Sequence, residues 1–249
     1  MFKTSNPTLN EKKFQETIDV HLGAKMTIDG TIQKTALLLI LTLLSAIFIW
    51  DSFFKAGETT PLIIGTIIGG AIVGLILAMI TIFSKKNAMY TAPLYALAEG
   101  FVLGGISAIM ENLFPGIVLQ AVALTFGVLF LMLTLYRLKI IRVTEKFRMG
   151  VFAATGAIML VYLVSFIMSF FGTGIPYIHE GGTIGIIFSL VVVGIASLNL
   201  TLDFDIIERG SKMGAPKYME WYGAFGIMVT LVWLYIEILR LLAKLRGND

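Results

Sequence analysis

Seven long apolar runs divide this chain, and they limit its fold more than any other feature of the sequence. They cover residues 34–53, 61–84, 90–110, 117–137, 149–171, 183–203 and 221–242. Each has roughly the 20 residues needed to cross the hydrocarbon core of a bilayer. Pro61, Pro115 and Pro176 stand where a helix would begin or end. We therefore predict an all-α polytopic membrane protein, with a tail over residues 1–33 and a transmembrane domain over residues 34–249.

The composition is that of a chain whose main solvent is lipid. Charged residues make up 14 % of the chain, whereas an average soluble domain has about 25 %. The absence of cysteine excludes disulfides, thiolate nucleophiles and cysteine metal sites. His21 and His179 are far apart in the sequence and cannot by themselves form a zinc site. We expect no soluble enzyme domain, no tightly bound cofactor and no nucleic-acid partner.

Lysine and arginine are concentrated in alternate loops. They occur in the tail up to Lys34 and in the loops after the second, fourth and sixth runs, whereas the other three loops together carry only Lys55. Basic loops tend to stay in the cytoplasm, so we predict a cytoplasmic N-terminus. With seven spans the C-terminus would lie outside. Arg240, Lys244 and Arg246 argue mildly against this and leave a re-entrant last segment as the alternative.

Three carboxylates in the third and sixth runs need an explanation, because an ionisable group in lipid costs several kcal/mol unless it is paired or hydrated. Glu99, in the middle of the third run, is either a hydrogen-bonded structural group or a cation or proton site. Asp203 and Asp205 end the sixth run about 200° apart around a helix, so at most one faces the bundle. We expect Asp205 to be solvated at the cytoplasmic interface. Asn199 shares a face with Asp203 and is expected to hydrogen-bond to it.

A fourth carboxylate, Glu237, lies deep in the last run. Arg240 follows three residues later, so a local ion pair is one interpretation of this glutamate. A carboxylate at this depth is also expected to face the interior of the bundle rather than lipid.

Glycines recur at intervals of four residues in two of the runs. They are Gly65, Gly69, Gly70 and Gly74 in the second run and Gly100 and Gly104 in the third. This spacing indicates closely packed transmembrane helices, and we read no ligand site into it.

Two motifs in the C-terminal third resemble a known family. The sixth run ends in LDFDII (residues 202–207), and the seventh contains LYIEILRLL (residues 234–242). Together with seven closely connected spans, these motifs are similar to those of the Bax inhibitor-1 family, also called the transmembrane Bax inhibitor motif (TMBIM) family. Residues 26–35 and 92–100 resemble its prokaryotic branch, which implies the inner (plasma) membrane of a prokaryotic cell.

The resemblance implies six helices around a central seventh, and a pH-sensitive calcium leak. It also implies a sensor made of two carboxyl groups that share a proton, which by motif are Asp203 and Glu237. Both are then candidate calcium contacts, with glutamate in place of the family's usual second aspartate. Two carboxyl groups at hydrogen-bond distance do not both ionise cheaply and titrate as a unit, and ionised carboxylates bind calcium. The remaining candidates are Glu99 and Asp205 for the cation pathway, and Asn199 and Arg240 as supporting residues.

Other function classes stay open at this point. A proton-coupled transporter of a small solute would use Glu99 as its coupling site, although the runs lack the paired glycine and proline interruptions typical of such proteins. A non-conducting regulator would act by binding membrane protein partners. An intramembrane enzyme is the least supported class, because no His-x-x-x-His or Gly-x-Ser-x-Gly motif occurs in the sequence.

The charge asymmetry predicts that the loop of residues 137–148 lies in the cytoplasm. Because the chain has no cysteine, a single cysteine introduced at Leu138 can be labelled alone. A membrane-impermeant maleimide should reach it in inside-out vesicles but not in intact cells. Labelling from the outside of intact cells would overturn the predicted orientation.

Overall fold

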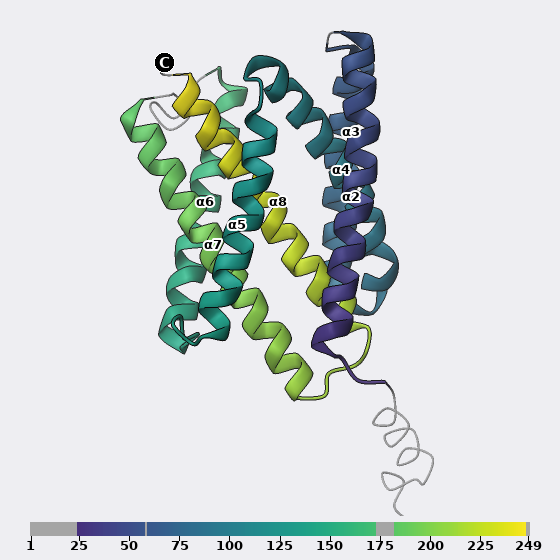
Figure 1. Ribbon diagram of the computed structural model, residues 1–249, viewed down its shortest axis with the longest axis vertical. Coiled ribbons are helices and arrows are strands. Elements are labelled where there is room, and N and C mark those ends of the chain that lie inside the picture. Colours follow the sequence, from purple (N-terminus) through teal and green to yellow (C-terminus); the bar gives the residue numbers. More distant parts are fainter. Residues whose placement is uncertain (1–23, 58, 173–181, 248–249) are drawn as a thin grey trace, which may run out of the picture.

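The computed structural model describes residues 24–57, 59–172 and 182–247, and these residues form a bundle of helices (Figure 1). Within them, seven helices are long and apolar enough to cross a membrane. They are α2 (Ile28–Ala56), α3 (Pro61–Phe83), α4 (Ala88–Leu113), α5 (Ile117–Arg137), α6 (Glu145–Phe170), α7 (Thr183–Lys212) and α8 (Met219–Arg246). The predicted all-helical membrane fold is therefore confirmed. His21, His179 and Pro176 lie outside the described residues.

Helix α2 begins at Ile28, inside the stretch that we expected to be a polar tail. The Thr27 side chain accepts a hydrogen bond from the Gly30 N–H (3.0 Å), which caps the first turn. An apolar run marks the part of a helix that lies in lipid, whereas the cap decides where the helix begins.

Helix α7 likewise continues past the end of its apolar run, to Lys212. Two ion pairs with helical spacing support the extra turns, Asp205 with Arg209 (2.8 Å) and Glu208 with Lys212. Such pairs stabilise a helix by a few tenths of a kcal/mol each, so α7 extends beyond its apolar part as a polar helix.

Helix α8 occupies the centre of the bundle. In its most apolar stretch 56 % of the residues are buried, against 11 % in α6. It packs against α2, α4, α5 and α7, while α3 packs mainly on α4 and α6 mainly on α7. In Figure 1 it crosses the molecule diagonally between the α5–α7 side and the α2–α4 side. The last apolar run thus forms a helix of 28 residues from one end of the bundle to the other.

The beginnings of α2 and α8 are tied together by a buried carboxylate. Glu220 is 0 % exposed. It accepts hydrogen bonds from the backbone N–H and the hydroxyl of Thr27, both 2.9 Å, and it forms an ion pair with Lys34. A β-carbon at Gly30 would overlap this carboxylate, so any other residue there would have to displace the Glu220 side chain.

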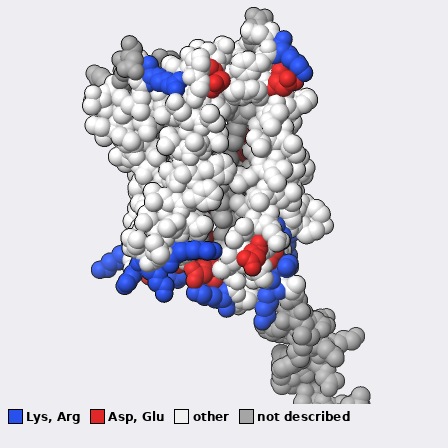
Figure 2. Space-filling model, in the orientation of Figure 1, with Lys and Arg blue, Asp and Glu red and all other residues white. Residues whose placement is uncertain are grey.

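The surface divides into charged ends and an apolar band. Figure 2 shows lysine and arginine gathered most densely at the end where α2 begins, with a smaller group at the opposite end and a largely uncharged band between them. Large apolar side chains are exposed in the spans, among them Phe48, Leu75, Phe130 and Leu160. A surface of this kind is stable in lipid.

Two glycines of α4 allow it to lie directly against α2. A β-carbon at Gly100 would overlap Ser45 and the carbonyl group of Thr42, and one at Gly104 would overlap the carbonyl group of Ala46. Close packing at these two positions agrees with the interpretation of the glycine spacing.

The glycines of α3 contribute unequally. A β-carbon at Gly70 would lie 2.9 Å from the Ala98 carbonyl oxygen, and Gly74 faces α4 beside Glu99, whereas Gly65 and Gly69 have nothing within 4 Å. Only one of the two glycine registers in α3 therefore packs against α4.

Replacing Gly104 by alanine should destabilise the bundle by roughly 1–3 kcal/mol, because a tightly packed contact would be overfilled. The thermal midpoint of the purified protein in detergent should fall accordingly. Gly127→Ala in α5 is the matched control, since nothing lies within 4 Å of an added β-carbon there and alanine favours the helix. Equal midpoints for the two variants would contradict this account of the α2–α4 contact.

Candidate functional site

Glu237 lies inside the bundle, as its depth in the last apolar run predicts. Its side chain is 2 % exposed. The Tyr162 hydroxyl of α6 donates to its Oε1 atom (2.7 Å), and so does Arg240 from the next turn of α8 (3.0 Å). The predicted local ion pair is therefore confirmed, and the carboxylate also faces inward.

Only one of the two oxygens of Glu237 is engaged. Within the described residues, Oε2 is buried and has no hydrogen-bond partner. Arg240 also contacts Tyr162, the other partner of Glu237. Its guanidinium lies over the Tyr162 ring, 5.4 Å from the centroid, and donates to the Tyr162 hydroxyl (3.1 Å). The unengaged oxygen gives this carboxyl group capacity for a proton or a cation.

A second cation follows one turn after Arg240 on α8. Lys244 is 7 % exposed. Its ammonium group donates to the Gly185 carbonyl oxygen (3.1 Å) and the Ser189 hydroxyl (2.9 Å), both near the start of α7. The part of the α7–α8 interface nearest the end of α8 thus carries positive charge, which opposes the passage of cations.

Asp203 faces α8 nearer the other end of the same interface. The Thr230 hydroxyl donates to its Oδ2 atom (2.6 Å). The aspartate lines a cavity of about 340 Å³, together with Tyr95, Tyr222 and Thr230. A β-carbon at Gly226 would lie 3.8 Å from Oδ1, so the glycine leaves the cavity open beside the carboxyl group.

The structure does not bring Asp203 and Glu237 into contact. Thr230, which binds Asp203, precedes Glu237 by seven residues on α8, and this separation is about 10 Å along a helix axis. Each carboxyl group has a different donor. The direct hydrogen bond that a proton-sharing pair requires is absent from the described arrangement.

Asp205 is not solvated, and our expectation for it is wrong. It is 7 % exposed. Its Oδ2 atom forms ion pairs with Arg148 of α6 (2.9 Å) and with Arg209 of α7 (2.8 Å). The two arginines cover the carboxylate, so its role is to link α6 to α7.

Asn199 does not bind Asp203, and that expectation is also wrong. Its amide donates to the Thr155 hydroxyl of α6 (2.8 Å) and to the Ile195 carbonyl oxygen of its own helix (2.9 Å). Thr155 on the neighbouring helix accepts the hydrogen bond that we had assigned to the aspartate one turn away.

Glu99 is half-buried between α3 and α4, beside Gly74. Tyr95, one turn earlier on α4, interacts with its carboxyl group. Tyr95 also lines the cavity that contains Asp203, so one tyrosine connects Glu99 with the wall of that cavity.

Three residues of the site have no clear signal in the sequence. Tyr162 and Thr230 belong to apolar runs in which a hydroxyl group indicates packing as readily as a site. The sequence marks Lys244 only as one of the basic residues that bear on topology. Its spacing of seven residues from Glu237 is the one available signal, because such residues share a face of a helix.

In the described ranges, no group of three or more histidine, aspartate and glutamate side chains could hold a metal ion.

Comparison with known proteins identifies the family of this chain. The sequence model of the Bax inhibitor 1 like family matches residues 6–247. No curated protein and no solved structure matches the chain significantly. Because the family match covers nearly the whole chain, the protein belongs to the Bax inhibitor 1 like family.

Proposed function

We propose that this protein is a pH-sensitive cation leak channel, with calcium as a permeant ion, and that it belongs to the prokaryotic branch of its family. The main support is Glu237, a carboxyl group at the centre of a membrane bundle with one buried oxygen that no described group engages. Ionisable groups at such depth are costly and typically mark the paths of ions or protons.

The proposed path follows the interface of α7 and α8. A cation from the predicted cytoplasmic end first meets the cavity that holds Asp203, where carboxylate and hydroxyl oxygens suit calcium. Glu237 is the second carboxyl group that the cation meets. Beyond it, Arg240 and Lys244 place two positive charges on the route, so we assign the described arrangement to the closed state.

The proposed pH sensor consists of Asp203 and Glu237. An ionised Glu237 holds Arg240 through a charge-assisted bond, which weakens when the carboxylate takes up a proton. The proposed sensor therefore acts by loosening the nearest barrier charge, Arg240. Sharing one proton between the two carboxyl groups requires a second state, in which α8 has moved relative to α7.

Calcium flux into liposomes that contain only the purified protein tests the proposal. Flux should occur and should vary between about pH 5 and about pH 8, a range that shifted carboxyl groups reach. Absence of flux would favour a non-conducting regulator that acts through membrane protein partners. Saturable solute uptake driven by a pH gradient would favour a transporter.

Asp203→Asn and Glu237→Gln should each shift or abolish the pH response of the flux. Both changes remove the titration and preserve the shape of the side chain. Asp205→Asn is the matched control and should keep the midpoint within about half a pH unit, because Asp205 faces α6 rather than the path. If Asp205→Asn alone moves the midpoint, the assignment is wrong by two positions. If none of the three moves it, the sensor lies elsewhere and Glu99 is the next candidate.

Arg240→Gln should raise the calcium leak at least about tenfold, because a nearby like charge adds on the order of 1.4 kcal/mol or more to the barrier for a cation. Arg246→Gln removes the same charge from the same helix at a surface site, where Arg246 donates to the Pro115 carbonyl oxygen and to Gln120. It should leave the leak unchanged. Equal rates for the two variants would show that Arg240 is not part of the barrier.

A further inference from the structure

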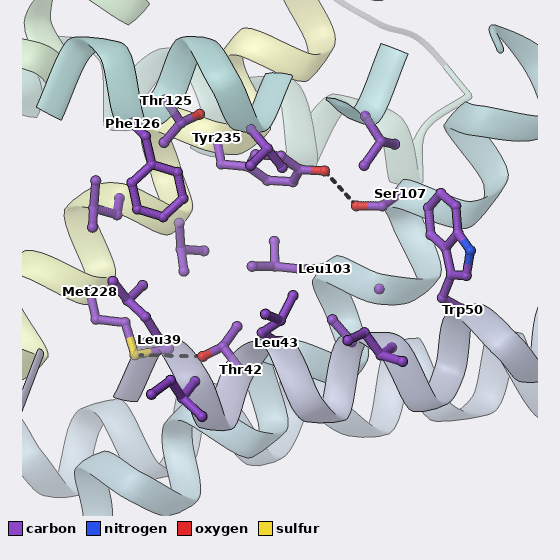
Figure 3. Close-up of a pocket in the computed structure, with 18 residues that line it drawn as sticks. Leu39, Thr42, Leu43, Trp50, Leu103, Ser107, Thr125, Phe126, Met228 and Tyr235 are labelled. Atoms are coloured by element: carbon purple, nitrogen blue, oxygen red, sulfur yellow. Dashed lines mark hydrogen bonds between the residues drawn. The ribbon is translucent and has the colours of Figure 1, made fainter. Parts of the chain in front are cut away.

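A second and larger cavity lies between α2, α4, α5 and α8, away from the carboxylates. Its volume is about 590 Å³, and none of its lining residues is charged or shared with the Asp203 cavity. Figure 3 shows Leu39, Leu43, Leu103, Phe126 and Met228 around the space.

The hydroxyl groups on this wall already have partners. Ser107 and Tyr235 hydrogen-bond to one another (2.6 Å, Figure 3). The Thr42 hydroxyl lies 3.0 Å from the Leu38 carbonyl oxygen, and the Thr125 hydroxyl donates to the Ala121 carbonyl oxygen (2.7 Å). Apart from the indole N–H of Trp50 at one end of the cavity, a ligand is therefore offered apolar contact and hydroxyl groups that are already paired, which fits a hydrocarbon chain.

The cavity opens sideways between two membrane-spanning helices. Its rim includes Ile40 and Ile47 of α2 and Val122 and Phe126 of α5, which are all exposed. These two helices are not among the closely packed pairs of the bundle. Figure 2 shows a hollow running down this face of the molecule, between the two charged ends. The medium outside the opening is therefore the hydrocarbon of the bilayer.

The extent of the cavity along the membrane normal matches one leaflet. On α2 it reaches from Leu39 to Trp50, which is about 16 Å at roughly 1.5 Å per residue. Half of a hydrocarbon core of about 30 Å is about 15 Å. Trp50 near the end of α2 and Val118 at the start of α5 mark the same end of the bundle. Tryptophan favours the level of the lipid headgroups.

We propose that this cavity binds one acyl chain of a glycerophospholipid, from the leaflet in which α2 ends, with the headgroup at the level of Trp50. In the predicted orientation this is the outer leaflet. A transmembrane helix of a second copy is about 10–12 Å across and is too wide for a cavity of about 590 Å³, a volume typical of small-molecule sites. The assignment does not depend on the proposed cation leak.

Photocrosslinking in the unmodified protein tests the assignment directly. The protein is reconstituted in phosphatidylcholine vesicles that contain a phosphatidylcholine with a diazirine in the middle of one acyl chain. After illumination, labelled residues are located by mass spectrometry. Label should concentrate on Leu103 and Leu231, which form the inner wall of the cavity. Label spread evenly over lipid-facing residues of α3 and α6 would overturn the proposal, and so would crosslinked dimers joined through the cavity rim.

A pair of tryptophan variants provides the matched control. Val122→Trp places a large ring in the mouth of the cavity and should reduce labelling of the inner wall several-fold. Val164→Trp makes the same change at another exposed valine, on α6, and should leave that labelling unchanged. Thermal midpoints of both variants show whether each is folded. If both are folded and the inner wall labels equally in the two, no acyl chain enters by this route.

Discussion

Lipid cannot solvate the carboxylate of Glu237, and the arrangement of the bundle depends on that constraint. The helix that carries it is the most enclosed of the seven in the described structure, with α2, α4, α5 and α7 packed around it. Its one hydrogen-bonded oxygen is held by Tyr162 and Arg240. A polar group of this kind is tolerated only where protein replaces water around it. The less enclosed helices, α3 and α6, can instead present apolar side chains to lipid.

The same bundle contains two cavities of opposite chemistry. The smaller one combines Asp203 with hydroxyl groups and lies toward the end of α7 and the start of α8. The larger one is apolar, opens toward the bilayer and has its hydroxyl groups paired internally. α8 contributes to both through neighbouring residues, Val229 and Thr230 to the first and Met228 and Leu231 to the second. Substitutions on α8 can therefore affect an ion site and a lipid contact together, and variants of this helix need matched controls.

The burial and direction of the site residues could be predicted from nearby sequence, whereas contacts with residues far away in the sequence could not. The depth of Glu237 in an apolar run predicted its burial, and the 200° separation predicted that Asp203 and Asp205 face different helices, which they do. The local ion pair of Glu237 with Arg240 was predictable from spacing, but the partners on other helices were not. Asp205 is covered by Arg148, and Asn199 binds Thr155; both partners come from α6, at a distance in the sequence that no local spacing rule reaches. The resemblance of two motifs to a family pointed to Asp203 and Glu237, but it could not tell which donor each one meets.

The sequence by itself determined that the chain crosses a membrane in seven helices. In lipid, every backbone hydrogen bond has to be made within the protein. Apolar runs long enough to cross the bilayer meet this requirement by forming membrane-spanning helices. It also determined which charges are out of place in lipid, because their cost depends only on depth. The tertiary structure alone decided how those charges are arranged: α8 in the centre, Glu237 against Tyr162, Asp203 against Thr230, and the acyl-sized cavity between α2 and α5. These contacts depend on how each helix is rotated and tilted against its neighbours, and that is settled by packing between residues far apart in the chain.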